Sequence, residues 1–361
     1  MNAMNRIKWL SNLYLPIFFA GLLVLLVSAK TTGSEPAQGR KFVVAAVGYY
    51  NVENLFDTIL SPLANDPEWT PQGTNQWNTE RYNHKIHNIS KVIGLMAQEL
   101  TPSGPAVLGL SEVENRQVMI DLANHPHIKD RNYQVVHYES PDRRGIDVGL
   151  IYQPRYFTYI SSKSYPTRIE GRDDFVTRDQ LLVTGELLGE RMHFIVVHWP
   201  SRLGGERRSR PLRIAAANLA RHIIDSIQTA EPGARVMIMG DFNDDPSDLS
   251  VSRHLRAHDN KVKLTDRDLY NPFLDFYRRG LGTLAYRDAW NLFDMVILTP
   301  SLLSNENNQL HLLRAEVFNR PFLRQTSGRF QGYGFRTFAG GVYLGGFSDH
   351  FPVYVFLVRE L

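Results

Sequence analysis

Short apolar runs recur between residues 42 and 358 and alternate with stretches of helical periodicity. Several runs are nearly continuous in Val, Ile and Leu, which is typical of strands that are covered on both faces. The predicted strands are Phe42–Tyr49, Ala106–Leu110, Tyr133–His137, Asp147–Tyr152, Leu181–Leu187, His193–His198, Arg235–Met239, Met295–Thr299 and Val353–Val358. The predicted helices are Arg81–Leu100, Gln117–Asn124 and Arg213–Thr229. This alternation indicates an α/β fold.

The main part of the chain is predicted to be one large domain over residues 42–361, although 361 residues could hold two. Residues 30–41 are polar, contain Gly, Pro and Ser, and are expected to form a linker. No second linker is visible beyond residue 40, which favours a single domain. Thr326–Gly346 is rich in Gly and aromatic residues and predicts an ordered, irregular surface loop.

The N-terminus has the pattern of an export signal. Arg6 and Lys8 precede an uncharged stretch whose apolar heart is Leu15–Val27, and Val27-Ser28-Ala29 resembles a small-residue cleavage site. We therefore expect residues 1–29 to be a secretory signal peptide, so that the protein is periplasmic, held in the cell envelope or secreted. The alternative is an uncleaved N-terminal membrane anchor, because the uncharged stretch is about long enough to span a bilayer. Membrane contact is expected only through this segment, and only if it is not cleaved.

Charge and cysteine content narrow the function classes. The absence of cysteine excludes disulfides, thiolate metal sites and cysteine nucleophiles. The whole chain has 40 Lys and Arg against 37 Asp and Glu. Without the two cations of the leader, 38 basic residues face 37 acidic ones, so a broad basic face of the kind that grips duplex DNA is not evident.

Five polar segments lie at the ends of predicted strands, where α/β sheets usually bind ligands. Four follow a strand and the fifth leads into the last one; they are 49–54, 110–115, 197–201, 239–246 and 346–352. Taken singly, a strand-terminal Asp or Asn is more often a turn former or a helix cap than a ligand. Five such segments together are hard to explain as turns and predict a shared site.

The side chains in these segments match the needs of phosphate ester cleavage. Mg²⁺ takes oxygen ligands and is typically held by one or two carboxylates, a role that suits Glu112, while Asn51 can add a neutral carbonyl. Asp241 and Asn243 are two apart, so on an extended segment their side chains point to the same side. The carboxylate can then activate water while the amide holds a phosphoryl oxygen.

Proton transfer has a separate candidate. His350 has an unperturbed pKa near the working range, about 6.5. Such a histidine needs an orienting partner, and Asp294 is a carboxylate at a strand entry that suits this role. Glu114 could support the metal ligands, and a capping or solvent-facing role is the alternative. Arg336 lies in the Gly-rich loop just before Asp349 and His350, and is a candidate substrate contact.

These motifs resemble the endonuclease/exonuclease/phosphatase superfamily, which includes deoxyribonuclease I, abasic-site endonucleases, neutral sphingomyelinases and inositol polyphosphate 5-phosphatases. The resemblance covers nearly all of residues 42–359. Its motifs follow the family's order: Asn-Val-Glu-Asn, Leu-Ser-Glu-Val, His-Trp-Pro-Ser, Gly-Asp-Phe-Asn, Phe-Asp-Met-Val and Ser-Asp-His-Phe-Pro. The resemblance implies a catalytic domain over 42–361 with a four-layer α/β fold, in which two packed mixed or antiparallel sheets are flanked by helices.

The resemblance also implies a role for each matching residue. Glu112 would be the principal metal ligand, with Asn51 and Asp349 nearby. Asp241 and Asn243 would handle the nucleophilic water and the phosphate, and His350, paired with Asp294, would be the general base or a phosphate-contacting imidazole. His198 would stabilise the phosphoryl oxygens or assist the leaving group, with Asp147 as a candidate to orient it. Arg178 resembles a phosphate-binding arginine of the deoxyribonuclease-like members.

The expected activity is metal-dependent hydrolysis of a phosphoester by in-line attack of water, with Mg²⁺ as the cofactor and Mn²⁺ or Ca²⁺ as alternatives. A secreted or envelope-associated endonuclease that cleaves DNA is the first hypothesis. A phosphodiesterase or phosphatase on lipid head groups or small phosphoesters is the second, and the near-neutral charge favours it. The third is an inactive member that binds phosphate compounds or a partner protein.

Overall fold

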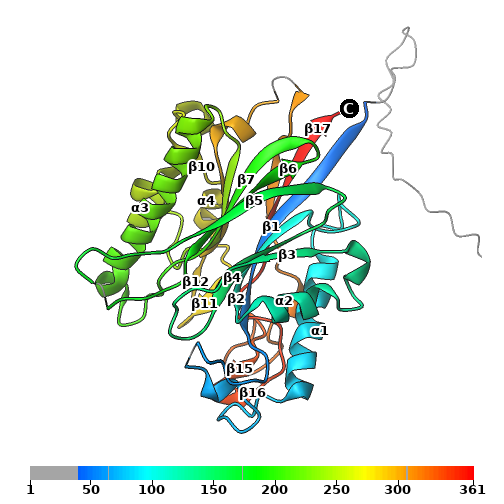
Figure 1. Cartoon of the computed structure of the whole chain (residues 1–361), viewed down its shortest axis with the longest axis vertical. Helices are drawn as coiled ribbons and strands as arrows, with labels where there is room; N and C mark the ends of the chain where they lie inside the picture. Colours follow the sequence, from blue (N-terminus) through cyan, green and yellow to red (C-terminus); the bar gives the residue numbers. More distant parts are fainter. Residues whose placement is uncertain (1–39, 64, 173, 306–307) are drawn as a thin grey trace, which may run out of the picture. The chain divides into compact units, whose positions relative to one another are not determined.

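The computed structural model describes residues 40–63, 65–172, 174–305 and 308–361. Phe42–Glu360 form one compact unit, built around two large β-sheets (Figure 1). The expected signal peptide or anchor over 1–29, and the expected linker up to residue 39, lie outside the described residues. Among the described residues, none of the helices combines the length and the apolar character that a membrane span requires.

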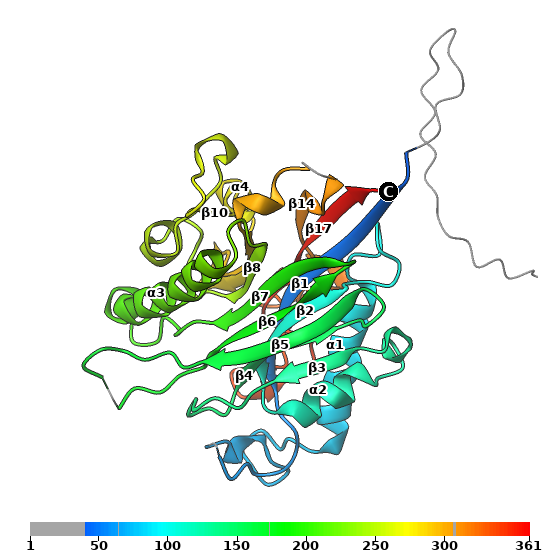
Figure 2. The ribbon, with the colours of Figure 1, turned by 45° about the horizontal axis from the view of Figure 1, so that its top comes forward.

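The first sheet has six strands in the order β14-β17-β1-β2-β4-β3. Its strands are β1 (Phe42–Leu55), β2 (Val107–Val113), β3 (Gln134–His137), β4 (Asp147–Tyr152), β14 (His311–Val317) and β17 (Val353–Glu360). β1 and β2 run parallel, and the other neighbours are antiparallel. The first and last long strands of the unit are therefore paired in the interior of this sheet, one strand in from its β14 edge (Figure 2).

The second sheet has seven strands in the order β5-β6-β7-β8-β13-β10-β9. Its strands are β5 (Phe157–Tyr165), β6 (Gln180–Leu187), β7 (Glu190–His198), β8 (Val236–Asp241), β9 (Ala257–His258), β10 (Leu269–Tyr270) and β13 (Asp294–Leu298). β7 and β8 are parallel, β9 and β10 are parallel, and the other pairs are antiparallel. Two short hairpins, β11 (Leu284–Tyr286) with β12 (Ala289–Asn291) and β15 (Phe338–Ala339) with β16 (Val342–Tyr343), lie outside the large sheets.

Helices cover the outer faces of the two sheets. α1 (Thr79–Leu95) and α2 (Arg116–Ala123) contribute buried apolar side chains to a core with the first sheet. α3 (Glu206–Ala230) packs its Ala and Ile face into the core of the second sheet, and α4 (Phe273–Arg278) adds Phe273 to it. Figure 1 shows α3 and α4 on one side of the sheets and α1 and α2 on the other.

A shared apolar core joins the two sheets. β1 contacts β8 and β13, and β4 contacts β7, so the sheets pack face to face. Val47 and Tyr49 from the first sheet belong to the same buried cluster as Val196, Met239 and Val296 from the second. Burial on two faces explains the nearly continuous apolar runs. The predicted four-layer sandwich with mixed, mostly antiparallel sheets is confirmed.

The element boundaries differ from the prediction where local signals were weak. β5 and β14 were not predicted, because both are edge strands with many exposed side chains and lack an apolar run. α3 begins at Glu206, seven residues before the predicted start at Arg213, and contains Pro211 in its first turns. The predicted irregular loop Thr326–Gly346 is ordered largely by turns and contains β15 and β16.

Candidate functional site

Strand direction brings the predicted site residues to one edge of the sandwich. β1 and β2 are parallel, so Asn51 and Glu112 lie near the same ends of these strands. β7 and β8 are also parallel, and His198 lies opposite Asp241 at their ends. Asp294 begins antiparallel β13 and is paired with Asp241.

Asp294 and His350 form a buried pair. His350 Nδ1 lies 2.7 Å from Asp294 Oδ2, and the two side chains are almost fully enclosed. Burial, the largest single effect, lowers the pKa of His350, but the carboxylates of Asp294, Asp349 and Asp241 together outweigh it and hold that pKa well above its usual value. The pairing fixes the ring so that Nε2 lies 3.9 Å from an oxygen of Asp241 and 3.9 Å from one of Asp349. His350 is therefore a charged imidazole aimed at the site.

Asp241 lies at the centre of the site. Its Oδ2 accepts a hydrogen bond from Asn51 Nδ2 at 3.1 Å and lies 3.6 Å from His198 Nε2. Its Oδ1 accepts the backbone N–H of Asn243 at 2.8 Å. Burial raises the pKa of Asp241 to about 7; His350 opposes this shift, and Asp294 adds to it. A carboxyl group with a pKa near neutrality can take up a proton during catalysis.

His198 is a buried, neutral imidazole. Burial, reinforced by Arg178 and Arg144, lowers its pKa well below the usual value. Its Nε2 faces Asp241 and lies 3.9 Å from Glu112 Oε1. Within the described residues its Nδ1 has no hydrogen-bond partner. A neutral ring with one free nitrogen can donate a hydrogen bond to a phosphoryl or leaving-group oxygen.

Asp147 does not orient His198, contrary to the prediction. Its Oδ2 lies 3.2 Å from His137 Nε2, and its Oδ1 accepts hydrogen bonds from the backbone and hydroxyl of Ser140. Asp147 is the first residue of β4, and its neighbours come from β3 and from the connection between these strands. The partner of a strand-end carboxylate is set by this pairing, which the sequence does not reveal.

Glu112 is positioned by an irregularity in β2. The residue has a φ of 61°, and the pairing of β2 with β4 shifts register between Ser111 and Val113. The bulge turns a side chain out of the regular alternation and toward the strand ends. Glu112 Oε2 accepts the backbone N–H of Asn54 at 3.0 Å, which fixes the carboxylate against the neighbouring strand.

The oxygen donors at this edge suit a hard divalent cation. Glu112 and Asp349 offer carboxylates that remain partly accessible, and Asp241 lies between them and the histidines. Part of the pKa rise of Asp241 comes from the charge of Glu112, so the group carries an excess of negative charge that a cation would offset. Asn51 is oriented differently from the prediction: its oxygen accepts the Glu53 N–H at 3.0 Å, and its nitrogen faces the carboxylates. Asn51 thus positions Asp241 directly.

The predicted substrate-binding arginines have different surroundings. Arg178 is buried, with Nη1 2.9 Å from Asp142 Oδ2 and Nη2 2.8 Å from the Trp199 carbonyl oxygen. The same carbonyl accepts Asn243 Nδ2 at 3.0 Å, so Arg178 supports the loop that holds Asn243. Arg336 is one-third exposed and lies 3.4 Å from Asp349 Oδ2, at the edge of the site.

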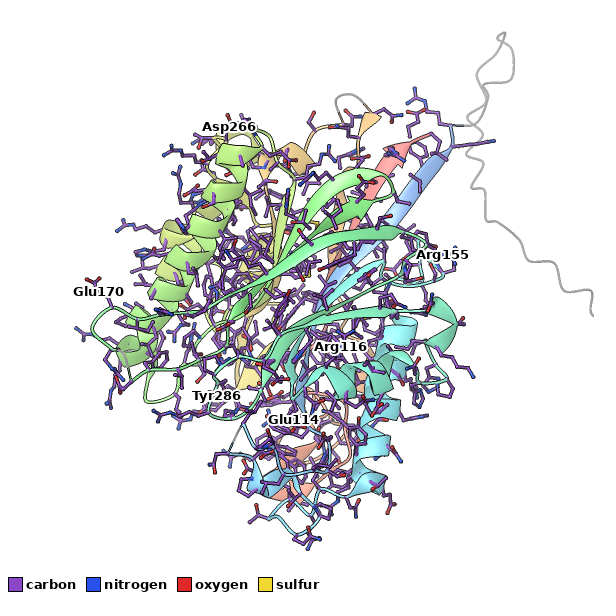
Figure 3. All side chains as sticks on the ribbon, in the orientation of Figure 1. Glu114, Arg116, Arg155, Glu170, Asp266 and Tyr286 are labelled. Atoms are coloured by element: carbon purple, nitrogen blue, oxygen red, sulfur yellow. The ribbon has the colours of Figure 1, made fainter. Side chains whose placement is uncertain are left out.

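Glu114 lies just beyond Glu112 and faces away from the central carboxylate. Its Oε2 accepts the Asp57 N–H at 2.6 Å, and burial raises its pKa to about 8. Figure 3 shows Glu114 at the lower end of the sandwich, near the start of α2. Glu114 thus supports the turn that follows β1, and β1 is the strand that carries Asn51 and Asn54.

Three further residues shape the site and were not among the predicted ones. Arg144 is half exposed and donates to Asn54 Oδ1 at 2.6 Å beside Glu112. Arg202 donates to the Asn243 carbonyl oxygen at 2.9 Å. It also forms ion pairs with the acidic residues that follow Asn243, namely Asp244, Asp245 and Asp248. This run of acidic residues is the sequence signal that could have indicated a basic partner. Lys85 joins the Gly-rich loop to α1 through Thr337.

The family model described as Endonuclease/Exonuclease/phosphatase family matches residues 46–359. None of the curated proteins matches the chain.

Solved structures share the fold at low sequence identity. A truncated TDP2 of Caenorhabditis elegans has 15% identity and a TM-score of 0.52, over 87% of this chain and 97% of that one. A mannosyl-6-phosphatase of Bacteroides thetaiotaomicron has 15% identity and a TM-score of 0.52, over 87% and 99%. TDP2 of D. rerio, complexed with a single-strand DNA product, has 12% identity and a TM-score of 0.50, over 87% and 98%. With this fold, the ordered motifs and the family match, the chain belongs to the endonuclease/exonuclease/phosphatase family, whose members are hydrolases of phosphoesters.

Proposed function

We propose that this chain is a metal-dependent phosphoester hydrolase that cleaves DNA. The observation that carries the proposal is the arrangement around Asp241, whose Oδ2 faces the Nε2 atoms of His198 and His350 at 3.6 and 3.9 Å. A charged imidazole, a neutral imidazole and a carboxyl group with a pKa of about 7 thus surround one position. These are the groups that general acid–base cleavage of a P–O bond requires.

The chain's own residues have separable tasks. Asp241 takes a proton from the attacking water, because its oxygen is the acceptor nearest to the other groups. His350, kept charged by Asp294, stabilises the negative charge that develops on the phosphoryl oxygens. His198 lies on the other side of Asp241 and donates a hydrogen bond to a phosphoryl or leaving-group oxygen of the substrate. A divalent cation held by Glu112 and Asp349, with Mg²⁺ as our proposed metal, would act as a Lewis acid toward a phosphoryl oxygen.

DNA is the preferred substrate for two reasons. The exposed Arg144 and Arg336 lie at the edge of the site, where they can contact phosphates on either side of a scissile bond. TDP2 of D. rerio, which has a similar fold, has been solved with a single-strand DNA product. The balance of 38 basic and 37 acidic residues beyond the leader favours a second candidate, a small phosphoester. The mannosyl-6-phosphatase of similar fold is named as an enzyme for such a small phosphoester.

A parallel substrate screen tests the proposal. The purified protein is incubated with plasmid DNA, RNA, sphingomyelin, mannose 6-phosphate and bis-p-nitrophenyl phosphate, with Mg²⁺, Mn²⁺ or Ca²⁺ and with EDTA. We expect Mg²⁺-dependent nicking of the plasmid that EDTA abolishes. Hydrolysis of small phosphoesters or of the lipid without nicking of the plasmid would contradict DNA as the substrate and support the second candidate function. No turnover of any substrate with any of the metals would support an inactive, phosphate-binding protein.

Three variants connect activity to the site. Glu112→Gln, His198→Ala and His350→Ala should each lower kcat by about 10²–10⁴-fold. His222→Ala is the matched control, because His222 is an exposed histidine of α3, which contributes no residue to the site. Nicking that persists unchanged in all three variants would overturn the proposed roles.

We further propose that residues 1–29 direct export and are removed. The supporting pattern is the pair of cations followed by the apolar stretch and Val27-Ser28-Ala29. Expression of the full chain in a bacterial host, followed by fractionation and intact-mass measurement, should give an exported protein that begins at Lys30. A full-length protein in the membrane fraction would identify the segment as an anchor instead.

A further inference from the structure

Three histidines meet on the helical layer of the first sheet. His87 lies on the exposed face of α1, and His125 and His127 lie on the turn that follows α2. One nitrogen from each ring can be chosen so that all three lie within 4.8 Å of one another. The ring centroids of His87 and His127 are 4.6 Å apart, and those of His125 and His127 are 5.0 Å apart. None of the three belongs to the segments that form the candidate active site.

The backbone holds two of these rings on a fixed turn. Ile128 and Lys129 donate their N–H groups to the His125 carbonyl oxygen, each at 2.9 Å, which closes the turn around Pro126. The Ile128 side chain is fully buried and anchors the turn to the core of the first sheet. His125 and His127 are therefore presented on the same side of the turn toward α1, and they are held there by packing.

A hydrogen bond determines which nitrogen of His125 is free. Ser90 Oγ donates to the His87 carbonyl oxygen at 2.9 Å and lies 2.8 Å from His125 Nδ1. Nδ1 of His125 also accepts the His127 N–H at 3.3 Å. Because the protein engages Nδ1 from two sides, Nε2 is the ring nitrogen left for an external ligand. A histidine that binds a metal through one ring nitrogen commonly has the other held by the protein.

We propose that His87, His125 and His127 form a binding site for a Zn²⁺-class transition-metal ion, which joins α1 to the turn after α2. Three imidazoles without a carboxylate suit Zn²⁺, Ni²⁺ or Cu²⁺ and not Mg²⁺. Zn–N distances of about 2.0–2.1 Å in a tetrahedral site place the ligand nitrogens roughly 3.4 Å apart. The exposed rings of His87 and His127 can close the remaining distance by rotation about their side-chain bonds. The fourth position is left for water or an external ligand.

The electrostatic surroundings are compatible with this assignment. Burial lowers the pKa of His125 and His127, with the neighbouring histidines as a second cause. The charge of Lys91, one turn along α1 from His87, also acts on His127, and its ammonium group lies over the Phe322 ring.

Zinc titration of the metal-free full chain by calorimetry tests the site, in buffer with excess Mg²⁺ to occupy the hard oxygen ligands elsewhere. We expect the wild type to bind one more Zn²⁺ than the double variant His87→Ala/His127→Ala. Any Zn²⁺ that still binds to His125 in the variant should do so with an affinity more than tenfold lower than that of the wild-type cluster. His222→Ala is the control and should bind as the wild type does. Co²⁺ in place of Zn²⁺ should give visible absorption bands that the double variant lacks.

The readout is independent of phosphoester hydrolysis. His87 and His127 are exposed, so the double variant should keep its circular dichroism spectrum. Zn²⁺ should raise the Tm of the wild type and leave that of the double variant unchanged at the same concentration. Equal stoichiometry and an equal Tm shift in the two proteins would overturn the site, whatever the outcome of the substrate screen.

Discussion

One oxygen atom, Oδ2 of Asp241, is the point where the side chains of the site meet. The Asn51 amide donates to it at 3.1 Å, and the rings of His198 and His350 approach it from different strands. Burial lowers the pKa of both histidines, but their pKa shifts are opposite, because His350 is hydrogen-bonded to the Asp294 carboxylate at 2.7 Å whereas the charges of Arg178 and Arg144 act on His198. The division of labour between the imidazoles therefore depends on Asp294.

Asp294→Asn is expected to lower kcat by about 10²–10⁴-fold with little change in KM. The amide keeps the shape of the carboxylate but removes the charge that holds His350 protonated, and an amide NH₂ turned toward Nδ1 would select the wrong tautomer. Steady-state kinetics on the substrate identified by the screen measure the effect. Asp266→Asn is the control, since Asp266 is exposed at the end of the sandwich opposite Glu114 (Figure 3). Equal kcat in wild type and Asp294→Asn would contradict the pairing.

Asp245 makes stability depend on pH. Burial raises its pKa from 3.8 to about 6, against the hydrogen bond from the Leu292 N–H and the charge of Arg202. Folding therefore favours the protonated form, and this contribution to stability is complete below about pH 4 and is lost as the pH rises through 6. Relative to Asp245→Asn, the wild type should lose about 2 kcal/mol between pH 4 and pH 7.

Urea unfolding of wild type and Asp245→Asn across this range gives the difference directly. The asparagine keeps an oxygen for the Leu292 N–H, so the comparison isolates the charge. A difference in unfolding free energy that stays constant with pH would show that Asp245 titrates near its ordinary value.

At the scale of elements, the loop Thr326–Gly346 is fastened to α1 and β1 by a buried pair. Lys85 Nζ donates to Thr337 Oγ1 at 2.6 Å and to the Phe347 carbonyl oxygen at 2.7 Å, and it lies 3.6 Å from Glu53 Oε2. Burial raises the pKa of Glu53 to about 7, in spite of the lysine. The fastening orders the segment immediately before Asp349 and His350.

Lys85→Met should lower the free energy of unfolding by about 3 kcal/mol, because it leaves Glu53 buried without its cation. Glu53→Gln combined with Lys85→Met should cost less than the sum of the single variants. Chemical denaturation of the four proteins completes the cycle. Lys91→Met, on the exposed face of the same helix, controls for the loss of a lysine. Additive single-variant effects would show that the two groups do not interact.

The predictability of an element followed its burial. Each of the nine predicted strands corresponds to an observed one, and most of them are buried on two faces, which leaves a continuous apolar signal; β3, a partly exposed edge strand, is the exception. β5 was not predicted for the converse reason: the side chains of its sequence FTYISSKSY are mostly exposed. The turn residues of the site were recognisable by type, but their partners were not. His137 as the partner of Asp147, and the Trp199 carbonyl oxygen as the point where Arg178 and Asn243 meet, depend on strand pairing between distant segments.

At the scale of the whole molecule, the two sheets share one apolar core and bring their acidic groups to one edge. Asp241 and Glu112 come from different sheets, and the charge of Glu112 contributes to the raised pKa of Asp241. An ion bound there joins the sheets, so its removal should weaken the whole unit.

Saturating Mg²⁺ should raise the Tm of the protein by about 3–5 °C, since an ion at 100 times its Kd contributes about 2.7 kcal/mol. EDTA should reverse the shift. Differential scanning calorimetry of the wild type and of Glu112→Gln makes the comparison, and the variant should respond weakly. A shift of equal size in the two proteins would locate the stabilising ion away from Glu112.

The pairing of β1 with β17 has a consequence for timing. β17 is synthesised after every other strand of the unit, yet it occupies a place between β14 and β1 near the middle of its sheet. Until β17 emerges from the ribosome, β1 lacks this neighbour, and the segment with Asp349 and His350, immediately before β17, is not held in place. A nascent chain without β17 therefore lacks a complete candidate site. The fold itself delays completion of the phosphoester-hydrolysing site until the end of this unit has been synthesised.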